Sequence, residues 1–371
     1  MDFSLDGEQR ALQASVSGTL DRTASLERVR AFAESGEAVA RDIWRALADL
    51  GAAGVLTPEA HGGLGLGLLE AALIAEALGA HAAPSPFLGS AVLAPIALLA
   101  AGSSAQQASW LPGLAAGELV AAVAISEGIG GARDGAGVSA SGGRLSGRAL
   151  FVIDALEADL IIVADREGRL HLVRGEAPGL TTTPLTTIDL TRRLGDISVN
   201  DTPAEPLEAG DARAALARLR DGAWTMLAAD MLGASATMID KAVAYAKERK
   251  QFGRLIGSFQ AVKHLCAEMA AELEPCRALV WYSAYAFDAA PPEAAVIAAH
   301  AKAHLSEVSR FVARTATEVH GGVGITDLLG LHFWFKRVGL DRQLLGGPER
   351  VRTVAATLQG LGLPSPASIE A

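Results

Sequence analysis

The chain has 371 residues, of which 50% are hydrophobic and 20% charged, a composition typical of a globular protein with a large core. The formal net charge of −10 argues against nucleic acid or an anionic membrane surface as the main partner, although local basic residues can still hold a dinucleotide or CoA. Cys266 and Cys276 fall in one helical pattern, ~15 Å apart along its axis, too far for a disulfide. A reducing compartment is predicted.

The N-terminal half of the chain shows no targeting or membrane-spanning pattern. Met1–Ser4 lacks the basic and apolar regions of a signal peptide. The longest apolar run, Ala91–Ala101, is broken by Pro95 and is too short to cross a bilayer. These features predict a cytoplasmic protein.

The pattern of residues divides the chain into three parts. From Asp6 to about Gly117 the signals are helical, interrupted by a glycine-rich loop at Thr57–Gly65. From Leu119 to about Asn200 short apolar runs alternate with turns, among them Gly142-Gly143, and no helix intervenes. This pattern predicts an antiparallel barrel or sandwich.

From Ala212 onward, apolar residues recur in steps of three and four, as in long amphipathic helices that pack in a bundle. Pro275 is expected to kink the second helix, and Pro291-Pro292 to open a third. A fourth is expected over Pro348–Gln359. The predicted domains are 1–117 (helical), 118–208 (β) and 209–371 (helical bundle).

Three short motifs in the last part stand out. The first is Glu248–Gly253 followed by Phe259-Gln260, the second is the glycine-rich block His320–Gly324, and the third is Leu344–Pro348. Taken singly, the first is explained by a solvated charged run that ends at a glycine, and the second by a helix C-cap. His320 fits a hydrogen-bonded turn residue, and the histidines show no metal-ligand spacing, so no metal site is predicted.

Taken together, these motifs resemble the C-terminal domain of the flavin-dependent acyl-CoA dehydrogenases. The resemblance covers the whole chain and includes Thr57–Gly65, Ile125–Glu127 and Asp189–Arg192. It implies an α+β multidomain fold, with an N-terminal helical domain, a middle β-barrel domain and a C-terminal four-helix bundle. It also implies FAD as the cofactor and α,β-dehydrogenation of an acyl-CoA thioester as the reaction.

The resemblance assigns roles to seven cofactor-binding residues. Arg249 would hold the pyrophosphate of a neighbouring subunit's FAD, because its planar charged fork suits phosphate oxygens. Within the subunit's own site, the hydroxyl of Ser126 and the aromatic ring of Phe151 would contact the flavin. Four further residues would lie at the neighbour's cofactor, with glycine allowing close backbone approach: Phe252, Gln260, Gly321 and Gly322.

The chain departs from the family where catalysis is concerned. The family's Tyr-Glu-Gly-Thr, whose Glu removes the α-proton, aligns with Leu345–Pro348, so Gly346 occupies the position of the base. The other position of a base in the family falls near Ala223. Ile153 stands in place of a flavin-contacting threonine, and Glu318 in place of a glutamine. Glu349 is a weak candidate for a displaced base, and a surface role in the first turn of a helix explains it more simply.

The residues that serve a neighbour are thus mostly kept, and those that build the subunit's own catalytic centre are mostly lost. This resembles the non-catalytic partner subunits of heteromeric actinobacterial acyl-CoA dehydrogenases of steroid side-chain degradation. Expected partners are an acyl-CoA thioester, a homo- or hetero-oligomer with a Glu-bearing sister subunit, and an electron-transfer flavoprotein or similar acceptor. A self-sufficient enzyme with a displaced base and a non-catalytic flavin- or acyl-CoA-binding protein remain as alternatives.

Overall fold

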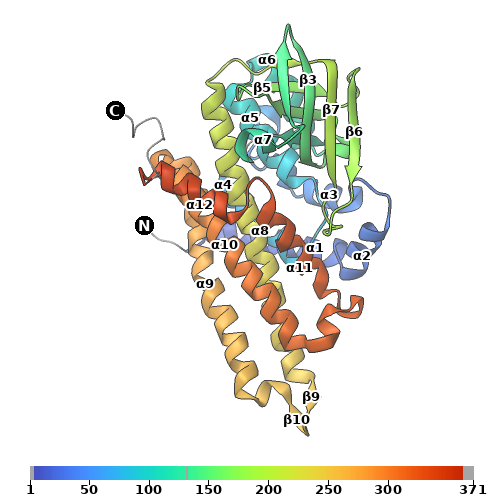
Figure 1. Ribbon diagram of the computed structural model, residues 1–371, viewed down its shortest axis with the longest axis vertical. Coiled ribbons are helices and arrows are strands. Elements are labelled where there is room, and N and C mark those ends of the chain that lie inside the picture. Colours follow the sequence, from blue (N-terminus) through green and yellow to red (C-terminus); the bar gives the residue numbers. More distant parts are fainter. Residues whose placement is uncertain (1–3, 131–132, 362–371) are drawn as a thin grey trace.

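The computed structural model describes residues 4–130 and 133–361. Figure 1 shows an elongated molecule with the sheets at one end and long helices that extend to the other. The first part is helical, as predicted. Its α-helices are α1 (Gly7–Thr23), α2 (Leu26–Glu34), α3 (Arg41–Ala48), α4 (Leu68–Ala80), α5 (Ala94–Ala101) and α6 (Ser104–Ala115).

The middle part contains two four-stranded sheets, in the orders β1-β4-β5-β8 and β2-β3-β7-β6. Val138 and Leu145 of one sheet and Ile161 and Val173 of the other share a separate core, so the sheets form a sandwich. The elements are β1 (Ala121–Ala124), α7 (Ser126–Gly130), β2 (Gly137–Ser141), β3 (Arg144–Ile153), β4 (Leu160–Ala164), β5 (Leu170–Arg174), β6 (Leu180–Leu185), β7 (Leu194–Pro203) and β8 (Glu205–Pro206).

Local signals set the hairpins of this sandwich. Gly142 and Gly143 both have positive φ (57° and 75°), as a tight two-residue turn between β2 and β3 requires. One pairing differs from the predicted antiparallel pattern, because β1 runs parallel to β4. The chain passes through β2 and β3 of the other sheet between these two strands, and such a crossover returns in the parallel direction.

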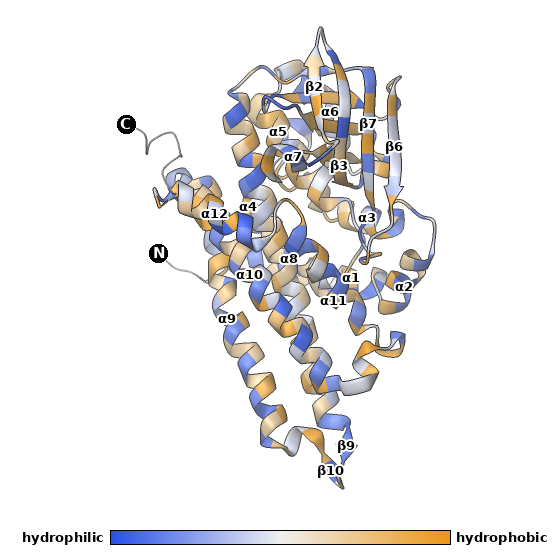
Figure 2. Cartoon of the chain, in the orientation of Figure 1, coloured by the Kyte–Doolittle hydropathy of each residue, from blue (hydrophilic) through white to orange (hydrophobic). Residues whose placement is uncertain are grey.

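The last part is a bundle of long helices joined by short turns. Figure 2 shows hydrophobic and hydrophilic residues interspersed along them. Pro291 opens α10 as predicted, and α9 continues through Pro275; α11 was not among the predicted helices. The elements are α8 (Ala212–Glu248), β9 (Lys250–Gln251), β10 (Arg254–Leu255), α9 (Gln260–Ala289), α10 (Pro291–His320), α11 (Leu331–Gln343) and α12 (Pro348–Leu358).

A buried cluster of charges joins the middle part to the bundle. The guanidinium of Arg337 on α11 donates two hydrogen bonds to the carboxylate of Asp230 on α8, at 2.8 and 2.7 Å. Arg192, which precedes β7, lies 2.8 Å from Asp230 and 3.0 Å from Asp341 of α11. We call Arg192, Asp230, Arg337 and Asp341 the interdomain ion cluster. The two contacts of Arg192, together with a hydrogen bond from Arg337 to the hydroxyl of Thr191 at 3.0 Å, connect the segment before β7 to α8 and α11.

Asp154 lies near this cluster and is buried, with one carboxylate oxygen that has no hydrogen-bond partner among the described residues. Burial raises the pKa of Asp154 to about 7, although the charges of Arg192 and Arg337 oppose the shift. The native state therefore keeps a proton that the unfolded chain loses near its ordinary pKa of 3.8. Stability is consequently lost as the pH rises from about 4 through 7.

Asp154→Asn is expected to remove the loss of stability that accompanies rising pH. Asparagine stays neutral and tolerates the left-handed backbone of this position (φ 59°). Urea unfolding should show a gain in the free energy of unfolding at pH 8, on the order of 4 kcal/mol, that shrinks toward pH 4.5. Asp201→Asn is the matched control, because Asp201 also has positive φ (50°) but is exposed. An equal gain in both variants, or a gain independent of pH, would contradict the explanation.

Candidate cofactor and substrate site

One group of predicted site residues lies at the end of the bundle farthest from the sheets. Arg249 caps α8 and is exposed, and β9 and β10 follow it as a small hairpin. Phe252 and Gly253 form its turn, both with positive φ (53° and 76°). The ring of Phe252 is 91% exposed and lies edge-on to Phe259, with ring centroids 6.2 Å apart.

The glycine-rich block meets the same end of the bundle. His320, the last residue of α10, stacks on Tyr245, whose carbonyl accepts the amide of Arg249. Gly321 has φ 64°, and a side chain at Gly321 or Gly322 would meet nothing within 4 Å. The backbone here is therefore open to a ligand or another subunit. We call Arg249, Phe252, Gln260, Gly321 and Gly322 the bundle-tip group; Gln260 is the exposed first residue of α9.

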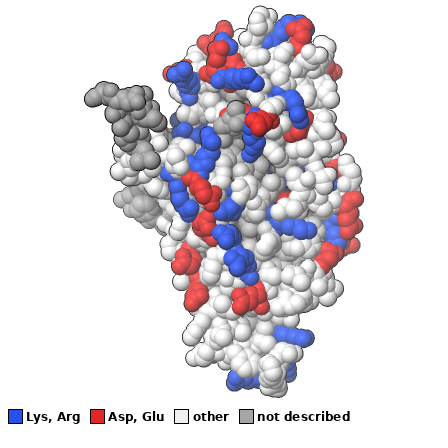
Figure 3. Space-filling model, in the orientation of Figure 1, with Lys and Arg blue, Asp and Glu red and all other residues white. Residues whose placement is uncertain are grey.

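Neighbouring groups on α10 account for the presence of His320 and Glu318 at this end of the bundle. The Nδ1 atom of His320 lies 2.7 Å from the carbonyl oxygen of Ala316, a hydrogen-bonded role that agrees with the sequence analysis. Glu318 lines a shallow hollow of about 320 Å³ on α10 together with Arg310 and Arg314. Figure 3 shows basic and acidic side chains mixed along the helical face at the centre of the view. The carboxylate of Glu318 therefore has cations nearby that offset its repulsion of phosphate.

The other group of predicted residues lies at one edge of the sandwich. Ser126 starts α7 directly after β1, and the carboxylate of Glu127 accepts the amide of Leu150 at 3.0 Å. Phe151 lies where the register of β3 and β7 shifts, and it has φ 55° and a 39% exposed side chain. Such a bulge re-aims a side chain out of the sheet. The guanidinium of Arg133 lies 4.6 Å from the centre of its ring.

A cleft of about 710 Å³ opens beside this edge, between the sandwich and the first turns of α8. Its walls include Glu127, Arg133, Arg166 and Arg213. Three guanidinium groups can each hold phosphate oxygens, but four carboxylates, those of Glu127, Asp134, Asp165 and Glu167, share the same walls, so the lining is mixed in charge. The sequence analysis did not single out these arginines, because they are far apart in the chain and follow no motif. The glycine-rich segment 128–137, which contains Arg133, is the one local pattern in the sequence that could have drawn attention to this cleft.

The two positions to which the family resemblance assigns a catalytic base carry alanine and glycine. Ala223 is fully buried on α8, and Gly346 lies in the turn between α11 and α12 with φ 111°. The indole of Trp224 donates a hydrogen bond to the carbonyl oxygen of Leu345 at 2.9 Å. A glutamate at position 346 would have to change the backbone, because only glycine adopts this φ readily.

Glu349 lies in the first turn of α12, with a side chain that is 75% exposed and 3.3 Å from the guanidinium of Arg342. Hydrogen bonding to its own backbone amide, aided by the charges of Arg342 and Arg352, lowers the pKa of Glu349. A general base gains from a raised pKa in a dry pocket. Glu349 is instead exposed to solvent and has a lowered pKa, so its environment does not suit a general base.

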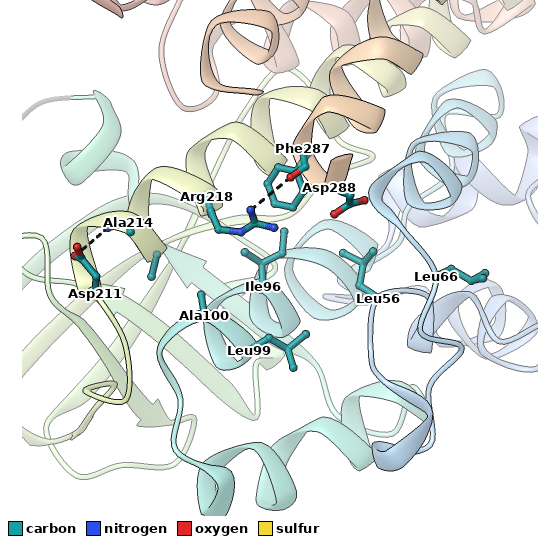
Figure 4. Close-up of a pocket in the computed structure, with 11 residues that line it drawn as sticks. Leu56, Leu66, Ile96, Leu99, Ala100, Asp211, Ala214, Arg218, Phe287 and Asp288 are labelled. Carbon is teal, nitrogen blue, oxygen red and sulfur yellow. Dashed lines mark hydrogen bonds between the residues drawn. The ribbon is translucent and has the colours of Figure 1, made fainter. Parts of the chain in front are cut away.

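A second cleft, of about 380 Å³, lies between α5, α8 and the end of α9 (Figure 4). Its walls are mainly apolar, and its charged groups already have partners. Arg218 stacks on the ring of Phe287 at 4.0 Å, and Asp288 accepts the amide of Leu68 at 2.7 Å. None of the predicted site residues lines this cleft.

The structure thus separates the predicted site residues into two groups. Ser126 and Phe151 lie at the sandwich, whereas the bundle-tip group lies beyond the other end of α8. Leu216 of α8 lines the cleft beside Glu127, and from Leu216 to Arg249 the helix rises ~50 Å at about 1.5 Å per residue. A single cofactor within one chain would have to span that length to contact both groups. In the described ranges, no cluster of side chains suits a metal ion, and no helix is both long and apolar enough to cross a membrane.

Comparison with known proteins identifies the protein family to which the chain belongs. Residues 6–118 match the family model "Acyl-CoA dehydrogenase, N-terminal domain", and residues 212–357 match "Acyl-CoA dehydrogenase, C-terminal domain". The chain is 34% identical to "Acyl-CoA dehydrogenase IpdE2" of Mycolicibacterium smegmatis over 94% of its own length and 98% of that protein. The chain therefore belongs to the acyl-CoA dehydrogenase family, whose members are FAD-dependent oxidoreductases.

Two solved structures place it within that family more closely. One is the ChsE4-ChsE5 complex from Mycobacterium tuberculosis, with a TM-score of 0.88 and 28% identity over 98% of this chain and 100% of the matched chain. The other is a variant of the Tcur3481-Tcur3483 steroid ACAD, with a TM-score of 0.86 and 31% identity over 95% and 98%. The first is named as a complex, and each of the two names joins a pair of designations.

Proposed function

We propose that this chain is the partner subunit of an oligomeric, FAD-dependent acyl-CoA dehydrogenase. It supplies the bundle-tip group to the cofactor of a neighbouring subunit and has no catalytic base of its own. The observation that carries this proposal is the ~50 Å along α8 between Arg249 and Leu216, which lines the cleft at the edge of the sandwich. In this proposal the sandwich group of one subunit and the bundle-tip group of another contact the same cofactor, so neither group completes a binding site alone.

Several features support the assignment of partners. The exposed backbone at Gly321 and Gly322 and the 91% exposed ring of Phe252 leave a surface for a neighbour and its FAD. Arg133, Arg166 and Arg213 are the groups in the sandwich cleft that would hold the phosphates of an acyl-CoA thioester, in a lining that also contains four carboxylates. By analogy with the named relatives, the neighbour is a Glu-bearing sister subunit and the acyl group is steroid-derived. The location is cytoplasmic, and an electron-transfer flavoprotein or similar protein accepts the electrons.

The chemistry of the site divides between cofactor and protein. Bound FAD would supply the acceptor for a hydride from the β-carbon of the thioester. The hydroxyl of Ser126 and the ring of Phe151 would hold the cofactor at the sandwich, and Arg249 would hold the phosphate charge of a neighbouring chain's cofactor. A base within hydrogen-bond reach of the α-carbon must take the proton. Neither Gly346 nor Ala223 supplies one, so in this proposal the sister subunit does.

Two alternatives remain testable. A self-sufficient enzyme requires Glu349 to leave its ion pair with Arg342 and enter the site. A binding or interaction protein would hold flavin or acyl-CoA without turnover. The domain boundaries near residues 117 and 208 also stay predictions.

Arg249→Ala is expected to lower FAD retention at least tenfold in the assembly purified after co-expression with a Glu-bearing sister chain. A charge-assisted hydrogen bond contributes about 1.5–3 kcal/mol, which corresponds to that factor near the dissociation constant. The measurement is flavin absorbance per protein at limiting FAD. Because Arg249 is exposed at the end of α8, the fold should be unaffected.

Arg254→Ala is the matched control. Arg254 lies in the same hairpin and carries the same charge, but its guanidinium stacks on Phe259 at 3.9 Å. Its removal should change FAD retention by less than twofold. Equal losses in the two variants would show that general charge, and not Arg249, holds the cofactor. Unchanged flavin content in both variants would show that the hairpin of β9 and β10 does not contribute to FAD binding.

A further inference from the structure

The last turn of α11 is completed by a side chain from another helix. An α-helix leaves the carbonyl oxygens of its last four residues without donors inside the helix, and in α11 these are residues 340–343. The amides of Leu344 and Gly346 donate to the first and the last of them, at 3.0 and 3.3 Å. The two in the middle accept hydrogen bonds from the ammonium group of Lys302 on α10, at 2.8 and 3.0 Å. All four carbonyl oxygens therefore have a donor.

The ammonium group of Lys302 also faces the turn that follows α11, residues 344–347. It lies 3.5 Å from the carbonyl oxygen of Gly346. Leu345 in this turn has φ 56°, and strain of this kind persists only where surrounding groups enforce it. The buried indole of Trp224 on α8 is one such group, because it donates to the carbonyl oxygen of Leu345 at 2.9 Å. Lys302 is the other, and α12 begins directly after the turn and packs on α10 (Figure 1).

Lys302 carries its charge in the interior without a carboxylate as partner. The residue is fully buried, and among the described residues no carboxylate forms an ion pair with it. The carboxylate of Asp341 faces a guanidinium of the interdomain ion cluster at 3.0 Å. Arg342 pairs instead with Glu307 of α10 and Glu349 of α12, at 3.0 and 3.3 Å. Burial lowers the pKa of Lys302 to about 7; the charge of Asp341 opposes this shift, and that of Arg342 reinforces it.

Loss of the proton changes the number of donors that Lys302 can offer. An ammonium group has three N–H donors, whereas a neutral amine has two and a lone pair. Three carbonyl oxygens surround the nitrogen atom, so a neutral amine leaves one of them without a donor. The contact with Gly346 is the longest of the three and is the one expected to be lost. A buried carbonyl group without a donor is unfavourable, and the strained turn then has one support fewer.

We propose that Lys302 is a proton-dependent cap of α11 and of the turn after it, so that the turn and the start of α12 are held firmly when Lys302 is charged and loosen when it is neutral. Lys302 is a positioning residue, because it acts on α12 through the backbone of the turn. The inference goes beyond the proposed function and does not depend on it, since it rests on contacts within one chain.

Hydrogen exchange of the full chain, followed by NMR at pH 6 and pH 8, measures the turn directly. The reporter is the Gly346 amide, and its protection is calculated after correction for the intrinsic exchange rate at each pH. Its protection factor should be about threefold to tenfold lower at pH 8, the effect of one lost hydrogen bond. The Gly102 amide is the internal reference, because it ends α5 with a bond to the carbonyl oxygen of Leu98 at 2.9 Å and has no lysine beside it. Its protection should not change.

The stability of the whole protein should change in the opposite direction. The unfolded chain keeps the proton of Lys302 up to its ordinary pKa of 10.5, whereas the native state releases it near 7. Between these values the unfolded state binds more protons, so the free energy of unfolding rises with pH. Relative to Lys302→Met, the folding equilibrium constant of the wild type should gain up to about tenfold per pH unit between pH 7.5 and 8.5 in urea unfolding. A turn that loosens while the protein becomes more stable is not explained by general unfolding.

Lys302→Met keeps the length of the side chain and removes every donor. Protection of the Gly346 amide should then be low and equal at pH 6 and pH 8. Lys241→Met is the matched control, because burial also lowers the pKa of Lys241, but its ammonium group lies over the ring of Trp334, 4.6 Å from the centre, and not at the turn. This variant should keep the wild-type fall in protection. A fall that persists in Lys302→Met, or that disappears in Lys241→Met, overturns the proposal.

A titration of the wild-type chain keeps the proposal testable if Lys302→Met does not fold. With ¹³C-labelled lysine, the Cε resonance of Lys302 should shift between pH 6 and pH 8, and protection of the Gly346 amide should fall along the same curve. A resonance that stays constant up to pH 9 would show that Lys302 does not change its charge in this range. Protection that stays constant while Lys302 titrates would show that its charge does not hold the turn. Either result overturns the proposal.

Discussion

Asp230→Asn is expected to destabilise the protein by about 3–5 kcal/mol. The substitution removes the carboxylate that lies 2.7 Å from Arg337 and 2.8 Å from Arg192. Both guanidinium groups are buried and would keep their charge without that partner. Urea unfolding at pH 7 measures the loss.

The pH dependence of this effect has a definite sign. Burial by itself would raise the pKa of Asp230, but the charges of Arg337 and Arg192 outweigh it and hold that pKa well below the usual 3.8. The stabilisation is therefore present at neutral pH and lost as the pH falls below about 4, where the unfolded chain takes up protons first. The difference between wild type and Asp230→Asn should shrink in acid.

Asp42→Asn provides the control for the interdomain ion cluster. Asp42 makes the same two-pronged contact with Arg28, at 2.8 Å for each bond, but its side chain is 55% exposed. Exposed pairs contribute about 0–1 kcal/mol. If Asp230→Asn costs no more than Asp42→Asn, burial does not make the cluster a major source of stability.

The purified chain alone is expected not to reduce bound flavin with any saturated acyl-CoA. In the proposed function Gly346 and Ala223 occupy the two positions that the family resemblance assigns to the base, and a general base contributes typically 10²–10⁴-fold to the rate. Residual turnover should be barely measurable. The measurement is rapid mixing of FAD-loaded homomer with short-chain, long-chain and steroid acyl-CoA thioesters.

Glu349→Gln and the sister subunit separate the alternatives in this experiment. Bleaching by the homomer that disappears in Glu349→Gln would make Glu349 the base and overturn the partner-subunit proposal. Bleaching that needs the sister chain and is unaffected by Glu349→Gln supports it. Gly346→Glu is not expected to restore activity, because the φ of 111° at this position disfavours any side chain.

The sequence predicted those parts of the fold that local patterns determine. Pro291 marks the start of α10, and Gly142-Gly143 forms the tight turn of the first hairpin. Helix α11 was missed because its buried face carries charged residues, Arg337 and Asp341, so the apolar stripe is interrupted. The parallel pairing of β1 with β4 was missed because it depends on the path of the chain through the other sheet.

The same limit applies to the site. Sequence motifs predicted the bundle-tip group and pointed to Gly346 and Ala223 as positions without an acidic or basic side chain. The contact of Trp224 with Leu345 joins residues 121 positions apart, and no local pattern indicates it. The arginines of the large cleft come together from separate segments in a comparable way.

One consequence of helix α8 concerns insertions and deletions. This single helix of 37 residues carries the buried Trp224 about a third of the way along and Arg249 at its end. Removing one residue between them would shorten the helix by about 1.5 Å and turn everything beyond by about 100°. The hairpin would then face another direction while the sandwich stayed in place. Changes of length between positions 224 and 249 should therefore be far more damaging than substitutions on the same helix, because a helix this rigid has no local way to absorb them.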